Sequence, residues 1–302
     1  MRPSLRPIAR SGRTGPSGWA FGIGLPAGLL AAFVAAYAGQ RSFIYRAVDF
    51  VAEPSLWQAG DLSVVRYRTA DGLELAGWYA PPGDPAKPTI LYFSGREGHL
   101  GLQAAKLRRF LDEGYGVMMA GYRGYAGNPG RPSELGLHTD AAAAAAFLAA
   151  QGIAADRTLV WGYSLGTAMA TRVAAAARFA GLVLEAPFES IPAVVQAHAR
   201  WTFGPLIWDR FNTRAVIAEV ASPILILHGS HDRVIPWTHG VALSRAAGDR
   251  AELVLLPGAG HGDTQDFGAL DHVADFLGRV APTTPSAEPD TIWAERDTEV
   301  AS

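Results

Sequence analysis

Residues 158–167 read TLVWGYSLGT, and this stretch decides the fold. Its apolar start predicts a short buried strand, and helical spacing begins at Leu165 and continues to Ala177. Between them lies a G-x-S-x-G pattern, which in this context forms a sharp turn that lifts a serine oxygen clear of the sheet. Ser164 is therefore the candidate nucleophile. The backbone N–H of Leu165, at a helix start, is the candidate donor to a developing oxyanion.

A base and an acid that could activate this serine lie downstream. A serine hydroxyl is a weak nucleophile until a histidine, oriented by a carboxylate, takes its proton. The strand predicted at 223–227 runs into Asp232, and the glycine-rich loop at 255–260 leads to His261. The chain order serine, acid, histidine is the one expected for this motif. We assign Asp232 as the acid and His261 as the base, with Asp263 as the alternative acid.

The second oxyanion donor is expected in the loop that follows the strand predicted at 89–93. Because the donor is a backbone N–H, the side chain at that position does not decide its identity. We assign the donor to Arg96, with Glu97 as the alternative. Gly95, which precedes the donor, and Tyr163, which precedes the serine, are expected to contact the substrate.

Composition excludes several classes of protein. The 302 residues include no cysteine, so a cysteine nucleophile, a disulfide scaffold and a cysteine-ligated zinc site are excluded. The formal net charge of −2 gives no reason to expect a nucleic acid as the main partner. No pair among the eight histidines has convincing metal-ligand spacing, so we expect no metal site, and we expect no cofactor.

Strands alternate with helices through the main body of the chain. This alternation predicts a mostly parallel central sheet with helices on both faces. The runs 62–69 and 73–80 flank a turn signal, which predicts a hairpin at the start of the sheet. Residues 187–222 break the alternation with an aromatic stretch and are expected to form a small helical cap. The last helix is predicted at 266–280.

Two further residues have expected structural roles. Ser133 is the expected N-cap of a helix at 135–150, because its hydroxyl can accept a hydrogen bond from the first turn. Arg123, in a glycine-rich segment, is expected to be a buried or half-buried arginine that holds the neighbouring loop.

The N-terminal segment needs an explanation of its own. Residues 1–18 carry four arginines and no acid, and residues 19–39 are apolar and roughly long enough to span a bilayer. They predict a basic cytoplasmic tail and a transmembrane signal anchor, with the catalytic domain at 40–281 outside the cytoplasm. An A-x-A-like sequence at 36–38 leaves a cleaved signal peptide and secretion as the alternative, and a soluble helix is the third interpretation. The acidic tail at 282–302 is expected to be disordered.

The sequence resembles the α/β-hydrolase superfamily over roughly residues 40–280. More narrowly, it is similar to the single-pass membrane-anchored branch with serine-aminopeptidase-like domains, which includes acyl-protein thioesterases and lysophospholipid lipases. The family usually has His-Gly-Asn where this chain has Ser94-Gly95-Arg96, so the shape and charge of the site mouth are expected to differ. The resemblance rests on the motifs Gly121–Gly127, Gly130–Gly136, Gly162–Gly166, Ala186–Phe188, Pro223–Asp232 and Gly260-His261. The second of these motifs is specific to the branch.

The resemblance implies an α/β-hydrolase fold with a small cap, preceded by one N-terminal transmembrane helix. Together with Ser164, Asp232 and His261 it predicts a serine hydrolase that cleaves ester, thioester or related acyl bonds through an acyl-enzyme. The aromatic, apolar stretch at 201–211 and the predicted anchor favour a carboxylesterase or lipase. A serine peptidase of the same fold and a non-catalytic ligand-binding protein are the alternatives. The expected partners are a small-molecule or lipid acyl substrate and, through the N-terminal helix, a membrane.

Overall fold

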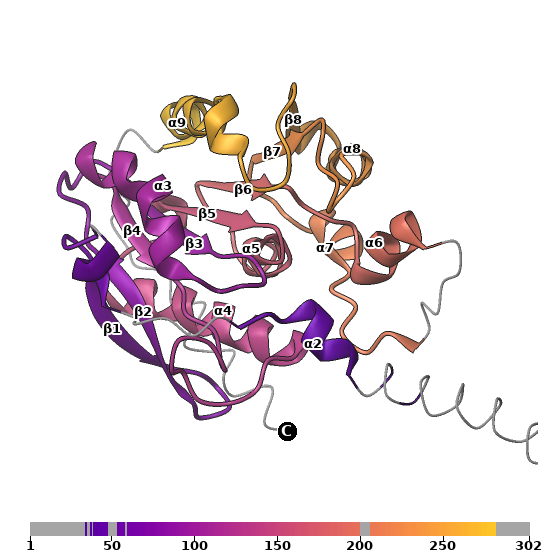
Figure 1. Ribbon diagram of the computed structural model, residues 1–302. Helices are drawn as coiled ribbons and strands as arrows, with labels where there is room; N and C mark the ends of the chain where they lie inside the picture. Colours follow the sequence, from indigo (N-terminus) through magenta and orange to yellow (C-terminus); the bar gives the residue numbers. More distant parts are fainter. Residues whose placement is uncertain are drawn as a thin grey trace, which may run out of the picture. The chain divides into compact units, whose positions relative to one another are not determined.

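An eight-stranded sheet organises the chain between residues 63 and 256 (Figure 1). Residues 1–40 and 41–302 separate into two units, and the description below concerns the second. The predicted anchor at 19–39 lies almost wholly, and the predicted tail at 282–302 entirely, outside the described residues. Within the described part of the chain, no helix is long and apolar enough to cross a bilayer. The computed structural model describes residues 34, 37, 39–47, 53–57, 59–199 and 206–281.

The strands are β1 (Ser63–Arg68), β2 (Glu74–Ala80), β3 (Thr89–Phe93), β4 (Gly116–Met119), β5 (Thr158–Tyr163), β6 (Gly181–Glu185), β7 (Ile224–Gly229) and β8 (Ala251–Leu256). They lie in the order β1-β2-β4-β3-β5-β6-β7-β8. β1 and β4 both pair antiparallel with β2, and all the other pairs are parallel. The chain leaves β3 toward one edge and returns to β5 on the other side. Ligands of open parallel sheets bind outside the carboxyl ends of strands at such a switch point.

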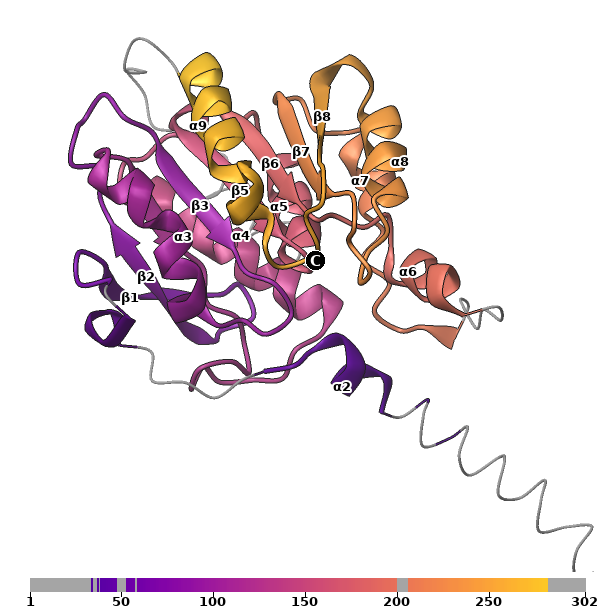
Figure 2. The ribbon, with the colours of Figure 1, turned by 45° about the horizontal axis from the view of Figure 1, so that its top comes forward.

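Helices cover both faces of this sheet. α3 and α9 pack on one face, and α4, α5, α7 and α8 pack on the other (Figure 1 and Figure 2). The helices are α2 (Gln40–Ile44), α3 (Leu100–Asp112), α4 (Glu134–Ala150), α5 (Gly166–Ala174), α6 (Ile191–His198), α7 (Thr213–Ile217), α8 (Thr238–Ala247) and α9 (Ala269–Val280). Short 3₁₀ helices are η1 (Pro54–Trp57), η2 (Ala155–Arg157), η4 (Gly248–Arg250) and η5 (Thr264–Phe267).

The central strands are buried on both faces. Every residue of β3, β4 and β6 is buried, as expected for parallel strands between two helical layers. Their side chains alternate between the layers: Leu91 and Phe93 pack on the α4 side, whereas Ile90 and Tyr92 pack on the α3 side. The carboxyl end of the sheet is therefore held between two separate apolar cores, which fixes the loops that leave it.

Two local predictions can be compared with the structure. Ser133 is the N-cap of α4, because its Oγ accepts a hydrogen bond from the N–H of Gly136 (3.1 Å), and this prediction is confirmed. The helix predicted at 266–280 is wrong at its start. Gly268 adopts a left-handed backbone (φ 85°), which separates η5 from α9.

The segment between β6 and β7 contains α6 and α7. Ser190 is the N-cap of α6, and residues 200–205 are not among the described residues. Asp209, which is buried, accepts two hydrogen bonds from Arg41 (2.7 and 3.1 Å). It also accepts one from the N–H of Glu134 at the start of α4 (3.1 Å). The described part of this segment is thus tied to α4 and to the chain that precedes the sheet.

Candidate active site

The turn between β5 and α5 has the geometry that the G-x-S-x-G pattern predicts. Ser164 has a positive φ of 50°, which is strained for a residue with a Cβ and is typical of functional turns. A Cβ on Gly162 would lie 2.4 Å from the carbonyl oxygen of Gly166, and one on Gly166 would lie 2.0 Å from that of Phe93. Only glycine fits at either position. The turn therefore needs both glycines, and it places the serine at the carboxyl end of the sheet.

Ser164, His261 and Asp232 form one continuous chain of hydrogen bonds. His261 Nε2 lies 2.9 Å from Ser164 Oγ, and His261 Nδ1 lies 2.7 Å from Asp232 Oδ2. A carboxylate can only accept, so Nδ1 carries the proton of the neutral ring and Nε2 is free to accept from the serine. The arrangement can move a proton from the serine hydroxyl to the imidazole.

Asp232 is held as an anion by its surroundings. Burial favours its neutral form, but His228, His261 and the backbone N–H of Ile235 outweigh this and hold the pKa well below its usual range. Its other oxygen, Oδ1, accepts from the N–H groups of Val234 and Ile235 (both 2.8 Å). The carboxylate is therefore fixed in orientation and can stabilise a positive charge on His261.

The loop that carries His261 is held by side chains that bond to its backbone. The hydroxyl of Tyr163 donates to the carbonyl oxygen of His261 (3.1 Å). Asp263, the alternative acid, accepts from the N–H of Gly260 (2.6 Å) and so supports the loop that leads to the histidine. Asp232 is the carboxylate that bonds the His261 ring.

The loop after β3 lies beside the serine. A Cβ on Gly95 would lie 3.3 Å from the Tyr163 ring and 3.4 Å from the Cβ of Ser164, so the loop approaches the serine closely. The backbone N–H groups of Leu165 and Arg96 donate to no group among the described residues. The carbonyl oxygen of Arg96 is held by the Arg46 N–H (3.1 Å) and the Tyr125 hydroxyl (2.9 Å). Two unused donors thus flank Ser164.

A cavity of about 200 Å³ opens over the serine. Its lining includes four residues that the sequence predicts at the site, Arg96, Glu97, Gly95 and Tyr163. The lining also includes side chains from the start of α3, which the sequence does not predict. The described residues contain no group of three or more histidine, aspartate or glutamate side chains that could hold a metal ion. The lining residues are Ser94, Gly95, Arg96, Glu97, Gly98, His99, Leu102, Gln103, Tyr163, Ser164, Val234 and His261.

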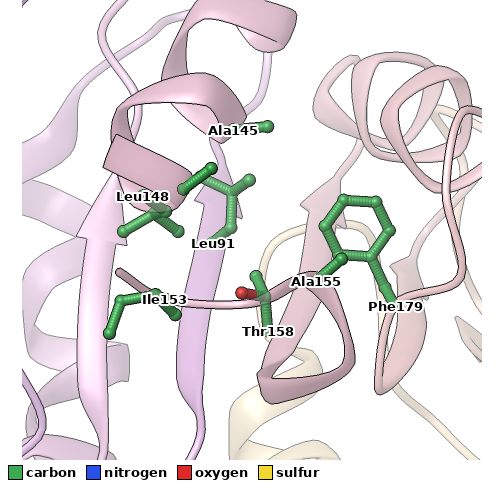
Figure 3. Close-up of a pocket in the computed structure, with 8 residues that line it drawn as sticks. Leu91, Ala145, Leu148, Ile153, Ala155, Thr158 and Phe179 are labelled. Atoms are coloured by element: carbon green, nitrogen blue, oxygen red, sulfur yellow. The ribbon is translucent and has the colours of Figure 1, made fainter. Parts of the chain in front are cut away.

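A second, much smaller cavity provides a contrast. Figure 3 shows it between α4, β3 and the chain that enters β5, where its labelled lining is apolar except for Thr158. Its volume of about 10 Å³ is at most the space of one water molecule. This cavity is a packing defect at the amino end of β5, whereas the cavity over Ser164 lies at the carboxyl end.

Two charged side chains beneath the site have no motif that identifies them. Glu185 is fully buried and pairs with Lys106, whose Nζ lies 2.7 Å from Oε1. The signal available in the sequence is a charge at the end of the otherwise apolar strand at 181–185. Its partner is 79 residues away, so spacing alone could not identify it.

Comparison with known proteins gives a family match and several sequence relationships. Residues 135–282 match the prolyl oligopeptidase family (Peptidase_S9). The uncharacterized protein Rv2307c of Mycobacterium tuberculosis is 35% identical over 250 residues, which covers 80% of this chain and 88% of that protein. The alpha/beta hydrolase domain-containing protein 17B of Xenopus tropicalis is 30% identical over 216 residues, which covers 70% of this chain and 73% of that protein.

Solved structures share the fold at lower identity. The esterase Pf2001 of Pyrococcus furiosus aligns with a TM-score of 0.65 and 18% identity, covering 79% of this chain and 99% of its own. The esterase Est2 of Thermogutta terrifontis aligns with a TM-score of 0.59 and 19% identity, covering 75% of this chain and 97% of its own. At these identities the likeness concerns the arrangement of strands and helices.

Proposed function

The chain belongs to the α/β-hydrolase superfamily, and we propose that it is a serine hydrolase that cleaves ester, thioester or related acyl bonds. One observation carries the proposal. The Ser164 hydroxyl, the His261 ring and the Asp232 carboxylate are hydrogen-bonded in series at the carboxyl end of a parallel sheet. This is the arrangement that activates a serine as a nucleophile.

The proposed reaction has two halves. Ser164 Oγ attacks the acyl carbon while His261 Nε2 takes the hydroxyl proton, and Asp232 stabilises the imidazolium that forms. The backbone N–H groups of Leu165 and Arg96 donate to the oxyanion of the tetrahedral intermediate. His261 then gives its proton to the leaving group, and the acyl group remains on the serine. A water molecule activated by His261 attacks the acyl-enzyme, and its proton passes through the ring back to Ser164.

We place the substrate among small-molecule or lipid acyl esters, in the manner of a carboxylesterase or lipase. The structural relatives whose fold the chain shares include esterases, which supports this choice. The cavity over Ser164, about 200 Å³, is smaller than the roughly 300–1,000 Å³ pockets that enclose drug-sized ligands. That volume favours a compact acyl group, or one whose longer part stays outside the cavity. Gly95 and Tyr163 are the proposed contacts to it.

A serine peptidase of the same fold is the second candidate. The observation that favours it is the match of residues 135–282 to the prolyl oligopeptidase family. Esters and peptide amides react through the same acyl-enzyme, so the two candidates differ in the leaving group that the site accepts. Parallel assays of p-nitrophenyl esters and of aminoacyl p-nitroanilides separate them, because a peptidase hydrolyses the anilides at a comparable rate.

The test of the reaction is the Ser164→Ala variant. We expect kcat/KM for a short-chain p-nitrophenyl ester to fall by about 10⁴-fold or more, because the nucleophile is removed. A fluorophosphonate probe should label the parent at Ser164 and leave the variant unlabelled. Ser55→Ala, an exposed serine in η1, is the matched control and should keep both activities.

Two results contradict the proposal. If Ser164→Ala hydrolyses the ester as fast as the parent, another group is the nucleophile. If the folded parent neither turns over esters or anilides nor reacts with the probe, the protein is a non-catalytic ligand-binding member of the superfamily. Ester substrates of increasing chain length then define the acyl preference of an active enzyme.

We also propose that the chain belongs to the membrane-anchored branch of the superfamily. The support is the sequence, in which a basic tail at 1–18 precedes an apolar stretch at 19–39. We expect the full chain to fractionate with membranes and its catalytic domain to be accessible from the extracytoplasmic side. A mature protein that begins near Gly39 would contradict the anchor and favour secretion after cleavage.

A further inference from the structure

Glu185 is a buried carboxylate with four hydrogen-bonded contacts. Lys106 Nζ donates to both of its oxygens (2.7 and 2.9 Å), and Trp161 Nε1 donates to Oε2 (3.2 Å). The hydroxyl of Thr264 donates to Oε1. A carboxylate without solvent is stable only when it is paired and hydrogen-bonded, so these partners are tightly constrained.

The contacts of Glu185 reach both ends of the serine–histidine pair. Its backbone carbonyl accepts from the N–H of Ser164 (2.9 Å), which holds the strained turn from below. Its side chain holds Thr264, which opens η5 only three residues after His261. One residue of β6 is thus bonded to the nucleophile turn through its main chain and to the histidine loop through its side chain.

Lys106 provides a second connection to the same loop. It is 7% exposed, and its Nζ lies 4.7 Å from the centre of the Tyr163 ring. Tyr163 in turn donates from its hydroxyl to the carbonyl oxygen of His261. A cation over an aromatic face is attracted by it, so the Lys106–Glu185 pair also fixes the ring that supports His261.

This support matters because the histidine itself belongs to no helix or strand. His261 lies between Gly260 and Gly262, outside any helix or strand, so its backbone is free unless side chains hold it. A displacement of about 1 Å between reacting groups can cost a rate of about 10²-fold. The distance between Ser164 Oγ and His261 Nε2 must therefore be set by neighbours.

We propose that Lys106, Glu185 and Thr264 form a positioning unit that sets this serine–histidine distance. The proposal rests on the proposed function, since it assumes that the pair is catalytic. None of the three residues lines the cavity over Ser164, so they act through the loops they hold and do not touch the substrate. The unit should therefore affect the chemical step and leave substrate binding nearly unchanged.

Thr264→Val is the decisive variant, because valine keeps the shape of threonine and lacks the hydroxyl. We expect kcat for a short-chain ester, counted per site labelled by the fluorophosphonate probe, to fall about 10- to 100-fold. KM should stay near the parent value. Thr264→Ser restores the hydroxyl and should recover most of kcat, which a purely packing role would not explain.

Thr158→Val is the matched control. Thr158 is as buried as Thr264 and lies at the end of β5 that is remote from Ser164. Its hydroxyl donates to the carbonyl oxygen of Ala154 (3.0 Å). It is bonded to neither the serine turn nor the histidine loop, so its kcat per labelled site should equal that of the parent. A parental kcat in Thr264→Val, or an equal loss in Thr158→Val, overturns the positioning role.

Glu185→Gln gives an independent test of the same unit. The amide has one acceptor oxygen, so it cannot accept from both Thr264 and Trp161 while it faces Lys106. We expect kcat per labelled site to fall at least as far as in Thr264→Val, and a parental kcat in a folded Glu185→Gln overturns the proposal. A parent that labels at Ser164 while all these variants keep its kcat overturns the positioning role and leaves the proposed function intact.

Discussion

Two buried charge clusters support opposite sides of the site, and they do so differently. Lys106 and Glu185 lie on the α3 side and contact the nucleophile turn and the histidine loop directly. The second cluster lies on the α4 side, where Arg123 donates to Asp140 (2.8 Å) and to Asp71 (2.7 Å). It reaches the site only through the chain that follows and precedes Arg123.

Two tyrosines make that indirect connection. The hydroxyl of Tyr122 donates to the carbonyl oxygen of Ser94, and that of Tyr125 donates to the carbonyl oxygen of Arg96 (both 2.9 Å). The segment around Arg123 therefore holds the loop after β3, which carries the proposed oxyanion donor. The difference between the clusters predicts that a substitution of Glu185 mainly lowers kcat. A substitution of Arg123 or its partners is expected mainly to lower the free energy of unfolding.

The largest stability effect is expected from Asp140→Ala. Asp140 is fully buried, and burial raises its pKa against the opposing hydrogen bonds from Arg123. Its removal leaves the guanidinium without its buried partner, which typically costs about 3–5 kcal/mol of unfolding free energy. Urea unfolding measures this loss, and the kcat per labelled site should change less than in Glu185→Gln.

Two controls belong to this prediction. Asp140→Asn keeps the shape of the side chain and should lose less stability, which provides a folded variant if alanine does not fold. Asp249→Ala, an exposed residue in η4, should unfold like the parent. An Asp140→Ala protein as stable as the parent would contradict the proposed difference between the two clusters, because the Arg123 cluster would then contribute nothing to the free energy of unfolding.

A smaller loss of stability, together with a modest fall in kcat, is expected from Tyr125→Phe. The variant loses one hydrogen bond to the carbonyl oxygen of Arg96, which typically contributes about 0.5–1.5 kcal/mol. It loosens the proposed oxyanion donor without removing it, so kcat should fall by less than the roughly 10²-fold of a lost donor. Steady-state kinetics with a short-chain ester checks this, and Tyr115→Phe on the α3 side is the control. An unchanged kcat would mean that the Arg46 N–H holds Arg96 sufficiently.

The smallest effect is expected from Asp71→Asn. Hydrogen bonds from Arg123 lower the pKa of Asp71, but its side chain is 48% exposed, so solvent screening limits its contribution to at most about 1 kcal/mol. Because its pKa is lower in the folded state, the contribution is present above the ordinary Asp pKa near 4 and is lost as pH falls. Melting temperatures at pH 7 and pH 3 should converge between parent and variant at the lower pH. A constant difference would contradict the ionic origin.

The catalytic candidates could be predicted because each belongs to a short local pattern. Ser164 lies in a contiguous motif whose glycines are required by steric contacts of 2.0–2.4 Å, so five letters determine the turn. Asp232 follows a predicted strand and His261 follows a glycine-rich loop, in the chain order that the motif predicts, and the structure brings them within hydrogen-bond distance of one another. The prediction that Arg123 is buried is confirmed, because the residue is 7% exposed.

Contacts between distant parts of the chain could not be predicted in this way. Lys106 and Glu185 are ordinary charges in sequence, and only the packing of α3 against the carboxyl end of β6 brings them together. The same is true of Asp71 and Asp140, which reach Arg123 from a hairpin and a helix. Gly268 is visible in the sequence, but nothing in the sequence indicates its left-handed φ, which separates η5 from α9.

The position of the segment between β6 and β7, at 187–222, has a consequence for how such a protein can change. The segment leaves β6 and returns in β7, and these strands are paired directly, from Leu182 with Ile224 to Glu185 with Leu227. Both ends of this segment are therefore held by the sheet, whatever the length or composition of the segment. Substitutions or insertions between 187 and 222 can therefore change this segment while β6 and β7 keep their register. The length and composition of the segment can vary independently of the strand pairing that positions Ser164, Asp232 and His261.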